Sequence, residues 1–394
     1  MRDKALLFVA LVAVVLSNPS VAFAEEEKEE KNDPSMAYQF TVEVEVERTP
    51  VKNQYRTGTC LCFATISYLE SELLRTGKGE FDLSEMFVVR NTYPKKADNY
   101  IRLHGKANFS QGGQAHDVMN CIRQNGLMPE SSYSGMEIEE SRHNHGEMVA
   151  VLTAMMDAVL TRKGKRVTPR WPDALAAVLD VYLGQNPESF SYDGQEYTPK
   201  SFNEKVLQLD PNDYIELTSY SHHEFYTQYR LELPDNWDYN GEYYNVPIDD
   251  LERIIEHALE NGHSVVWDGD VSEEEFNSKK TGYAVVPETE WEDRLHEEQD
   301  LEKVFTGPVK EKVITQELRQ KTLNNFTTTD DHLMHIVGLA RDQDGTRFFL
   351  TKNSGGTDRK NDGYIYMSQA YVRLKTTAIL VNKAAIPEDI ANKL

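Results

Sequence analysis

Three residues that lie far apart in the sequence could together perform nucleophilic catalysis with a thiol. The first is Cys60, in a stretch where Gly58 and Thr59 can end a loop and cap a helix. Unpaired N–H groups and the dipole at the first turn of a helix favour a thiolate. The apolar stripe that this helix would bury leaves Cys60 out, because its members are Cys62, Ile66, Leu69 and Leu73. We therefore interpret Cys60 as a candidate nucleophile.

A thiol nucleophile needs a base that a third polar group holds in one tautomer. His332 and Asn353 lie at the two ends of a predicted hairpin whose strands cover 332–340 and 347–351. The segment between the strands, Asp342-Gln343-Asp344-Gly345, is a turn signal. Residues at the open end of a hairpin can lie side by side, so the pattern favours an imidazole held by an amide.

Composition limits the classes of partner and cofactor. The chain has a formal net charge of −23, so it cannot neutralise nucleic acid or an anionic membrane surface, and neither is an expected partner. Its three cysteines, Cys60, Cys62 and Cys121, allow one disulfide and one free thiol. His222-His223 and His143-Asn144-His145 lack a third ligand at a metal-binding spacing. We interpret them as surface histidines and expect no metal or other cofactor.

The chain begins with the pattern of a signal peptide. Arg2 and Lys4 precede an apolar run from Ala5 to Leu16, and Ala22-Phe23-Ala24 fits an A-x-A cleavage site. The run is too short to span a membrane comfortably, so no stable membrane insertion is expected. Residues 1–24 would be removed on export to the periplasm or the cell exterior. Residues 25–36 would form an acidic, solvated tail.

The remaining residues, 37–394, are long for one simple domain, which favours a core with an insertion or two lobes. Helical signals dominate the first part of this body and strand signals the last part. Helices are predicted near 84–89, 115–124, 149–160, 171–183 and 247–261, and strands at 264–267, 363–367 and 377–381, besides the hairpin.

The candidate residues resemble those of papain-like cysteine peptidases. Gln54, Cys60, Asp331-His332 and Lys352-Asn353-Ser354 follow the order of the Gln, Cys, His and Asn of that superfamily. The similarity is to the bleomycin hydrolase and aminopeptidase C branch, because it extends through the middle of the chain and covers most of residues 45–385. The stretches that carry it are 112–114, 183–187, 197–202, 244–249 and 266–271.

The resemblance implies an α+β papain-like fold of two lobes. A helical lobe would be led by the helix of Cys60, and a β-rich, barrel-like lobe would contain His332 and Asn353. The separation of 272 residues between Cys60 and His332 exceeds the ~130–150 of compact papain-like enzymes. An inserted helical segment around 138–245 is therefore expected.

The resemblance also implies roles for single residues. Cys60 would attack the scissile carbonyl, His332 would share and later deliver the proton, and Asn353 would hold the imidazole. The Gln54 side chain, with the N–H of Cys60, would form the oxyanion hole.

Two further inferences concern the substrate and the base. Gly112 and Gly113 would hydrogen-bond the substrate backbone. His335 is a competing base, but in a strand it would face the opposite side from His332. The His-Leu-Met string that starts at His332 also matches the family pattern, so we prefer His332.

The implied activity is that of an exported cysteine peptidase that hydrolyses peptides through a thioester, most simply an aminopeptidase; homo-oligomers occur among the relatives. Leu61 and Gly355 replace two Trp residues of the family. The second indole shields the His–Asn hydrogen bond from water, so its loss predicts weaker orientation of the imidazole.

The alternatives are a weakly active or inactive peptide-binding protein of the same fold, and an endopeptidase. A transglutaminase-like reaction would need Asp in place of Asn353.

The C-terminus bears on the choice between aminopeptidase and endopeptidase. In the relatives the last residues lie in the cleft and present a carboxylate to the amine of the substrate. Here residues 386–394 follow the last predicted strand, and Pro387 separates them from it. The sequence allows either an arm that reaches the cleft or a short helix from Pro387 to Leu394.

Overall fold

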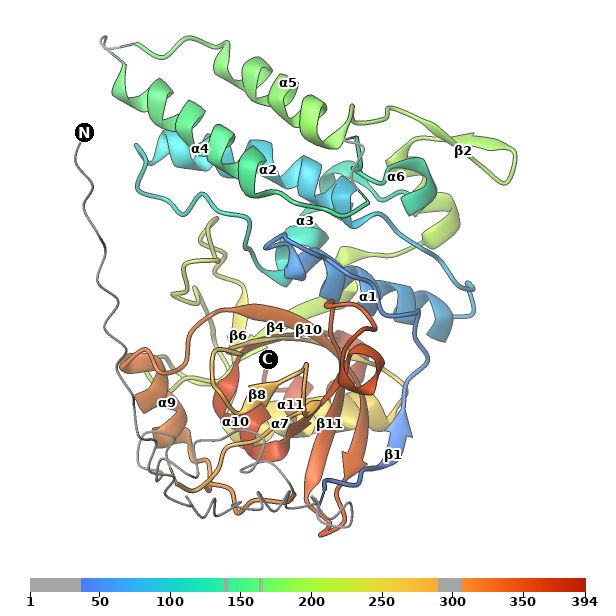
Figure 1. The fold of residues 1–394 in the computed structure, drawn as a ribbon, viewed down its shortest axis with the longest axis vertical. Helices are drawn as coiled ribbons and strands as arrows, with labels where there is room; N and C mark the ends of the chain where they lie inside the picture. Colours follow the sequence, from blue (N-terminus) through green and yellow to red (C-terminus); the bar gives the residue numbers. More distant parts are fainter. Residues whose placement is uncertain (1–36, 138–140, 163, 165, 290–306) are drawn as a thin grey trace, which may run out of the picture.

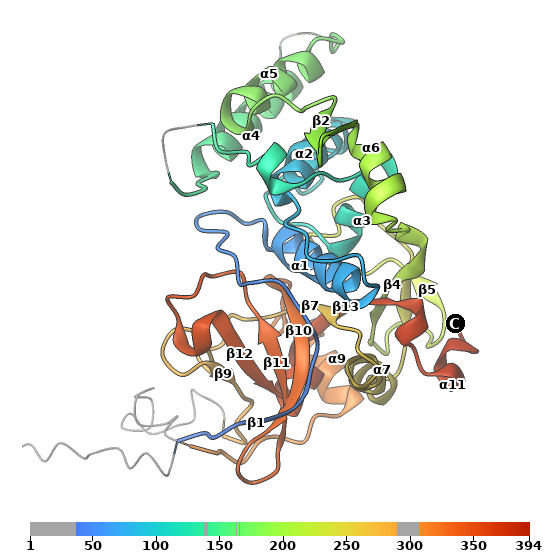
Figure 2. The ribbon, with the colours of Figure 1, turned by 90° about the vertical axis from the view of Figure 1, so that its right-hand side faces the viewer.

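The structure, a computed structural model, describes residues 37–137, 141–162, 164, 166–289 and 307–394. The expected signal peptide (1–24) and acidic tail (25–36) lie outside these residues. A helical lobe lies against a β-rich lobe in both views (Figures 1 and 2), as the papain-like prediction requires. In the described segments no helix has the length and apolarity needed to cross a membrane.

The helical lobe is built from the first half of the chain. Its helices are α1 (Cys60–Arg75), α2 (Glu85–Arg102), α3 (Ala115–Asn125), α4 (Gly146–Thr161), α5 (Trp171–Leu183) and the short α6 (Pro199–Phe202). Ser84 caps α2, since its hydroxyl accepts a hydrogen bond from Phe87 N at 3.0 Å. These bounds confirm the predicted helices of this lobe.

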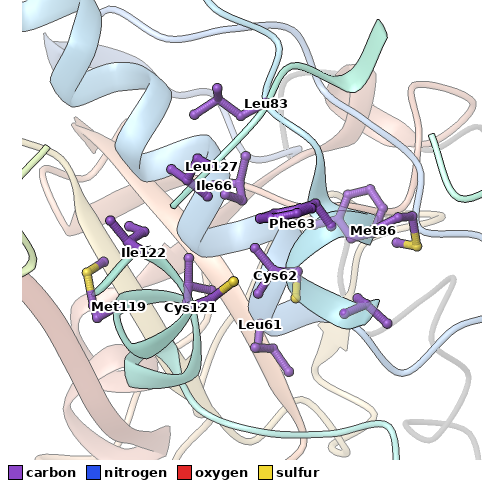
Figure 3. Packing of buried hydrophobic residues seen from close by; sticks show 14 of the residues in the cluster. Leu61, Cys62, Phe63, Ile66, Leu83, Met86, Met119, Cys121, Ile122 and Leu127 are labelled. Atoms are coloured by element: carbon purple, nitrogen blue, oxygen red, sulfur yellow. The ribbon is translucent and has the colours of Figure 1, made fainter. Parts of the chain in front are cut away.

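Helix α1 is the centre of the molecule. Every side chain from Cys60 to Leu73 is buried, because α2 and α3 pack on one face of α1 and the β-rich lobe on the other. Figure 3 shows the packing on the helical side, where α1 residues meet those of neighbouring segments: Leu61, Cys62, Phe63, Ile66, Leu83, Met86, Met119, Cys121, Ile122 and Leu127. The predicted single apolar stripe therefore understates how completely this helix is enclosed.

The β-rich lobe contains a sheet of eleven strands among the described residues, in the order β5-β6-β4-β13-β7-β10-β11-β12-β9-β8, with β1 added on β10. Most neighbours are antiparallel, and β4–β6 and β9–β12 are parallel. The strands are β1 (Thr41–Glu45), β4 (Tyr214–Thr218), β5 (Gln228–Tyr229), β6 (Tyr243–Asn245), β7 (Val265–Gly269), β8 (Phe276–Asn277), β9 (Tyr283–Ala284), β10 (His332–Arg341), β11 (Arg347–Lys352), β12 (Tyr364–Ser368) and β13 (Thr376–Asn382). A separate hairpin pairs β2 (Phe190–Tyr192) with β3 (Gln195–Tyr197).

Helices also accompany the sheet: α7 (Ile248–Glu260), α9 (Gln316–Asn324), α10 (Gln369–Lys375) and α11 (Glu388–Ala391). The amphipathic α7 buries an apolar face against the strands, as its spacing predicts; that face comprises Leu251, Ile254, Ile255, Ala258 and Leu259. The predicted hairpin is present as β10 and β11, which pair antiparallel.

The predicted inserted segment, 138–245, is helical only in part. Helices α4 to α6 and the β2–β3 hairpin occupy residues 146–202, and they pack on the helical lobe. The strands β4, β5 and β6 belong to the main sheet. The part of the predicted 138–245 segment from residue 214 onward is thus not helical, because its short strands complete the edge of the sheet beyond β13.

Candidate active site

Cys60 begins α1 at the boundary between the lobes. The Thr59 hydroxyl does not cap the helix; it lies 2.7 Å from the Thr57 hydroxyl. The thiol is buried and lies at the backbone amide of Leu333, the residue after His332. Burial raises the pKa of Cys60 to about 12, against an opposing effect of the Leu333 amide. The expected stabilisation of a thiolate by the helix start is therefore outweighed by desolvation.

His332 and Asn353 meet at the open end of the hairpin, as the sequence predicts. His332 Nε2 lies 2.9 Å from Asn353 Oδ1. The same oxygen accepts a hydrogen bond from the backbone N–H of Ser354 at 2.7 Å, so it is an acceptor and His332 Nε2 carries the proton. Burial lowers the pKa of His332, and the bond to Asn353 opposes this effect. His332 Nδ1 is consequently left to accept a proton.

The packing of β10 along α1 sets His332 at the level of Cys60. His335 Nδ1 lies 2.9 Å from Ser67 Oγ, seven residues beyond Cys60. Seven residues of helix and three residues of strand each span about 10 Å. Because His335 contacts Ser67 and Leu333 contacts Cys60, β10 and α1 run in the same direction away from Cys60. His335 itself lies about 10 Å along the helix from Cys60, so it is not the base.

Gln54 is tied to the segment that follows Asn353. Its backbone N–H donates to Ser354 O at 2.9 Å, and its Oε1 accepts a hydrogen bond from the Ser354 hydroxyl. One side-chain N–H donates to Thr57 O at 2.7 Å. The carboxamide is thus fixed between the Cys60 loop and the hairpin, with a second N–H available.

The Gly112–Gly113 segment follows Gln111, which contacts the loop that leads into Cys60. The backbone N–H of Gly58 donates to Gln111 Oε1 at 2.8 Å, which ties this segment to the loop before α1. A Cβ at Gly112 would lie 1.9 Å from Asp235 Oδ2. A Cβ at Gly113 would lie 2.2 Å from Asp117 Oδ2. Both positions therefore require glycine because carboxylates lie directly on the backbone.

Comparison with known proteins decides the family. The model of the Peptidase C1-like family matches residues 8–394. The chain belongs to this family. It is therefore a cysteine-type peptidase by family, in agreement with the resemblance that its motifs carry.

Individual relatives are distant but cover most of the chain. Aminopeptidase G of Lactobacillus delbrueckii subsp. lactis is 22% identical and is matched over 86% of this chain and 82% of its own length. Aminopeptidase W of the same organism is 23% identical, over 90% and 85%. The mitochondrial Cysteine proteinase 1 of Saccharomyces cerevisiae is 22% identical, over 90% and 79%.

A solved structure supports the fold. The crystal structure of PepW from Lactobacillus rhamnosis HN001 superposes with a TM-score of 0.69, at 17% identity, over 90% of this chain and 84% of that one. The papain-like architecture of two lobes is thus shared with a known member of the group.

Arg359 lies against Gly355, the position at which the sequence resemblance predicts an indole. A Cβ at Gly355 would lie 2.4 Å from Arg359 Nε, and that Nε donates to Gly355 O at 2.9 Å. The guanidinium contributes to the lowered pKa of His332. A cation therefore lies beside the His332–Asn353 pair, where a side chain at position 355 would begin. Leu61, at the other departure, packs in the helical core (Figure 3).

Three carboxyl groups that sequence reasoning missed surround the thiol. Asp268, Asp235 and Asp330 all act to raise the pKa of Cys60. Burial raises the pKa of Asp268 to about 7 and that of Asp330 well above its usual value, and the charge of Asp268 adds to the rise at Asp330. Of these three carboxyl groups, only Asp330 lies near a candidate catalytic residue in the sequence, two residues before His332.

Asp235 is the carboxyl group of this set that lies on Gly112, one of the two glycines that the resemblance assigns to the substrate. Asn108 Nδ2 donates to Asp235 Oδ1 at 2.8 Å. Burial raises the pKa of Asp235, and Lys96 and Asn108 oppose this effect. The buried ammonium of Lys96 also donates to the carbonyls of Ser110 and Gly112, so it fixes the backbone on which Asp235 lies.

The C-terminal segment forms the short-helix alternative and does not lie in the cleft. Asn382, at the end of β13, donates to Glu72 Oε2 at 2.9 Å. Glu72 is twelve residues beyond Cys60, or about 18 Å along α1. From there α11 docks on α7, where Arg253 pairs with Asp389 at 3.0 Å. Figure 2 shows the C-terminus beside α7 and α11.

The other histidines differ in part from the sequence interpretation. His145 is 4% exposed, with no hydrogen-bond partner for either ring nitrogen, and burial lowers its pKa to about 4. It is therefore a buried residue and not a surface one. His222 and His223 are partly exposed, and both Nε2 atoms contact Glu232, a third group that the sequence spacing did not reveal. All three cysteines are free thiols.

Proposed function

We propose that the chain is an exported cysteine aminopeptidase that uses Cys60, His332 and Asn353. The observation that carries this proposal is the 2.9 Å contact between His332 Nε2 and Asn353 Oδ1, with the Cys60 thiol at the amide of the next residue, Leu333. This arrangement supports a neutral imidazole whose Nδ1 faces the helix start, ready to take the thiol proton.

The reaction follows from these positions. His332 Nδ1 takes the proton of Cys60 as Sγ attacks the scissile carbonyl. The oxyanion accepts hydrogen bonds from the Cys60 N–H, which has no intrahelical acceptor in the first turn, and from the free N–H of Gln54. His332 then protonates the leaving amine as the C–N bond breaks. Water, deprotonated by His332, hydrolyses the thioester and restores the thiol.

A preference for a free N-terminus is supported by Asp235. Its carboxylate lies on Gly112, where the N-terminal side of a bound substrate would extend. An α-ammonium at this point would pair with the carboxylate, whereas a longer chain would collide with the loop that carries it. The bacterial relatives named aminopeptidases G and W agree with this direction.

The test compares an aminoacyl fluorogenic amide with its N-acetylated form. The free amine should be cleaved with a kcat/KM about tenfold or more higher, since a charge-assisted contact is lost on acetylation. Asp235→Asn should reduce this ratio, and Asp173→Asn, an exposed control on α5, should not. Equal cleavage of both substrates would identify an endopeptidase instead.

A second candidate, a peptide-binding protein without turnover, is favoured by one observation. Burial, with the three carboxyl groups, raises the pKa of Cys60 to about 12, which opposes thiolate formation. Labelling with iodoacetamide or an epoxide at neutral pH separates the two. An active peptidase should label Cys60 far faster than a free cysteine, and ordinary reactivity would support the binding role.

Export has its own test, independent of catalysis. The expected cleavage after Ala24 predicts that the secreted chain begins at Glu25. N-terminal sequencing of protein recovered from the periplasm or medium would show this start. Recovery of the chain only in the cytosol, with Met1 retained, would contradict it.

A further inference from the structure

An open cavity of about 800 Å³ lies directly beside the candidate catalytic residues. It is bounded by Gly355, the second residue after Asn353, and by Asn53, the residue before Gln54. These two residues form a backbone bridge to each other. The cavity thus adjoins both the residue that orients His332 and the residue assigned to the oxyanion hole.

The charges around this cavity are mainly positive. Four cationic side chains line it, and Asp358 is the acidic residue in the same lining; the cations are Arg56, Arg142, Lys279 and Arg359. In a chain with 65 acidic and 42 basic residues, such a group is expected to attract carboxylates of the protein itself.

None of these four cations has a carboxylate partner among the residues that the structure describes. Arg142 lies over the ring of Tyr55 at 5.6 Å. Arg359 donates to the carbonyl of Gly355 and, at 3.3 Å, to the Ser278 hydroxyl. These contacts orient two guanidinium groups without neutralising them. The unpaired charge is therefore available to an anion that enters the cavity.

The cavity lies on the side of the leaving group. His332 must deliver its proton to the amine that departs, so that amine lies on the His332 side of Cys60. Arg359 is close enough to lower the pKa of His332, whereas Asp235 lies on Gly112, next to Gln111, whose side chain accepts a hydrogen bond from Gly58 in the loop before Cys60. The part of the substrate that follows the scissile bond is consequently directed toward the cations.

We propose that this cavity binds a carboxylate of the leaving peptide, so that the preferred substrates are short peptides whose leaving part ends in a free α-carboxylate. This inference rests on the proposed peptidase function. It adds a second charge requirement to the first: the acidic side of the cleft takes the ammonium end of the substrate, and the basic side takes the carboxylate end. An acidic side chain just after the scissile bond offers the same chemistry.

The kinetic test uses three tripeptides and one fluorogenic substrate. The tripeptides are Ala-Ala-Ala as the free acid, its C-terminal amide, and an amide with Glu after the scissile bond; the aminoacyl fluorogenic amide has no carboxylate. The free acid should exceed its amide in kcat/KM by roughly tenfold, the value of one charge-assisted contact. A preference for the Glu amide over the free acid would identify the side chain as the carboxylate that binds.

The variants Arg56→Gln and Arg142→Gln should each reduce that preference and leave cleavage of the fluorogenic amide unchanged. Arg166→Gln, an exposed arginine after α4, is the matched control and should keep the preference. A wild-type enzyme that treats all three tripeptides alike, or a preference that survives the double variant Arg56→Gln/Arg142→Gln, would overturn the proposal.

A binding measurement separates this proposal from the proposed function. Titration calorimetry on Cys60→Ala should show tighter binding of Ala-Ala-Ala than of its amide, again by roughly tenfold. The difference should disappear when Arg56→Gln and Arg142→Gln are added. This result would support the carboxylate site even if the chain proved to have no peptidase activity, and equal binding of acid and amide would exclude it.

Discussion

His332 Nε2 lies 2.9 Å from Asn353 Oδ1, and the backbone N–H of Ser354 donates to the same oxygen. The side-chain amide of Asn353 is therefore oriented by the neighbouring backbone, independently of its contact with the imidazole. The hydrogen bond from Ser354 thus fixes Asn353 Oδ1 in a position that orients His332.

Removal of that amide should impair catalysis more than folding. Asn353→Ala is expected to lower kcat/KM for an aminoacyl fluorogenic amide by about 10- to 100-fold, because the imidazole loses its fixed tautomer. Asn261→Ala, an exposed asparagine after α7, serves as the control. Unchanged kinetics in Asn353→Ala would remove Asn353 from the catalytic group.

The pKa values of the thiol and the imidazole predict a labelling profile. Burial raises the pKa of Cys60 to about 12 and lowers that of His332, so both shifts disfavour a resting thiolate, and alkylation at neutral pH requires His332 to take the thiol proton as Sγ attacks. In His332→Ala the rate of Cys60 alkylation should rise about tenfold per pH unit between about pH 6 and 10. The wild type should react much faster at neutral pH and depend less on pH.

Mass spectrometry of peptides alkylated by iodoacetamide measures these rates. Cys62 and Cys121, both buried free thiols, are internal controls in each sample. Equal rates for wild type and His332→Ala would show that His332 does not take the thiol proton.

The contact between Gly112 and Asp235 predicts a double-mutant effect. Gly112→Ala should displace Asp235, since the added Cβ would lie 1.9 Å from Oδ2, and kcat/KM for the free-amine substrate should fall about tenfold or more. In an Asp235→Gly background the same substitution should cost far less. Gly146→Ala is the control, because its Cβ would meet Asn144 at an ordinary 3.5 Å. Additive effects would show that the two residues act independently.

Glu72 links the far end of α1 to β13 and predicts a dependence of stability on pH. Burial alone would raise the pKa of Glu72, but the His263 ring, 3.2 Å away, and hydrogen bonds from Arg75 outweigh it and lower the pKa from 4.5 to about 2. A lowered carboxyl pKa contributes stability above about pH 4.5, and this contribution is lost as the pH falls toward 2. The shift corresponds to about 3 kcal/mol.

Urea unfolding of the wild type and Glu72→Gln measures this contribution. The variant should be less stable by about 3 kcal/mol at pH 7, with a smaller difference as the pH approaches 2.5. Glu260→Gln, at an exposed position at the end of α7, should match the wild type throughout. A difference between wild type and Glu72→Gln that is independent of pH would assign the loss to packing instead of charge.

Local signals explain which parts of the fold could be predicted. The helix start at Cys60 and the hairpin from His332 to Asn353 depend on caps, turns and periodicity within short segments, and the structure has both. Asp235 and Arg359 reach the site from loops whose paths depend on the whole fold. No local pattern in the sequence distinguishes these two residues from surface charges.

Burial was the property that local patterns predicted least well. The sequence favours one buried stripe on α1, yet the helix is enclosed by both lobes. His145 has a polar neighbourhood in sequence but is covered by the tertiary structure. The short strands β5 and β6 contain two and three residues, too few to show the alternation that identifies a strand. The sequence therefore does not separate them from the predicted helical insertion around 138–245.

The anchoring of α11 on α7 has a practical consequence. Ile390 is fully buried there, and Arg253 holds Asp389, so the tail is fixed at a distance from the thiol of its own molecule. The peptide bonds of α11 are therefore held away from the thiol of the same molecule. An affinity tag or a fusion partner attached after Leu394 would leave the cleft unobstructed.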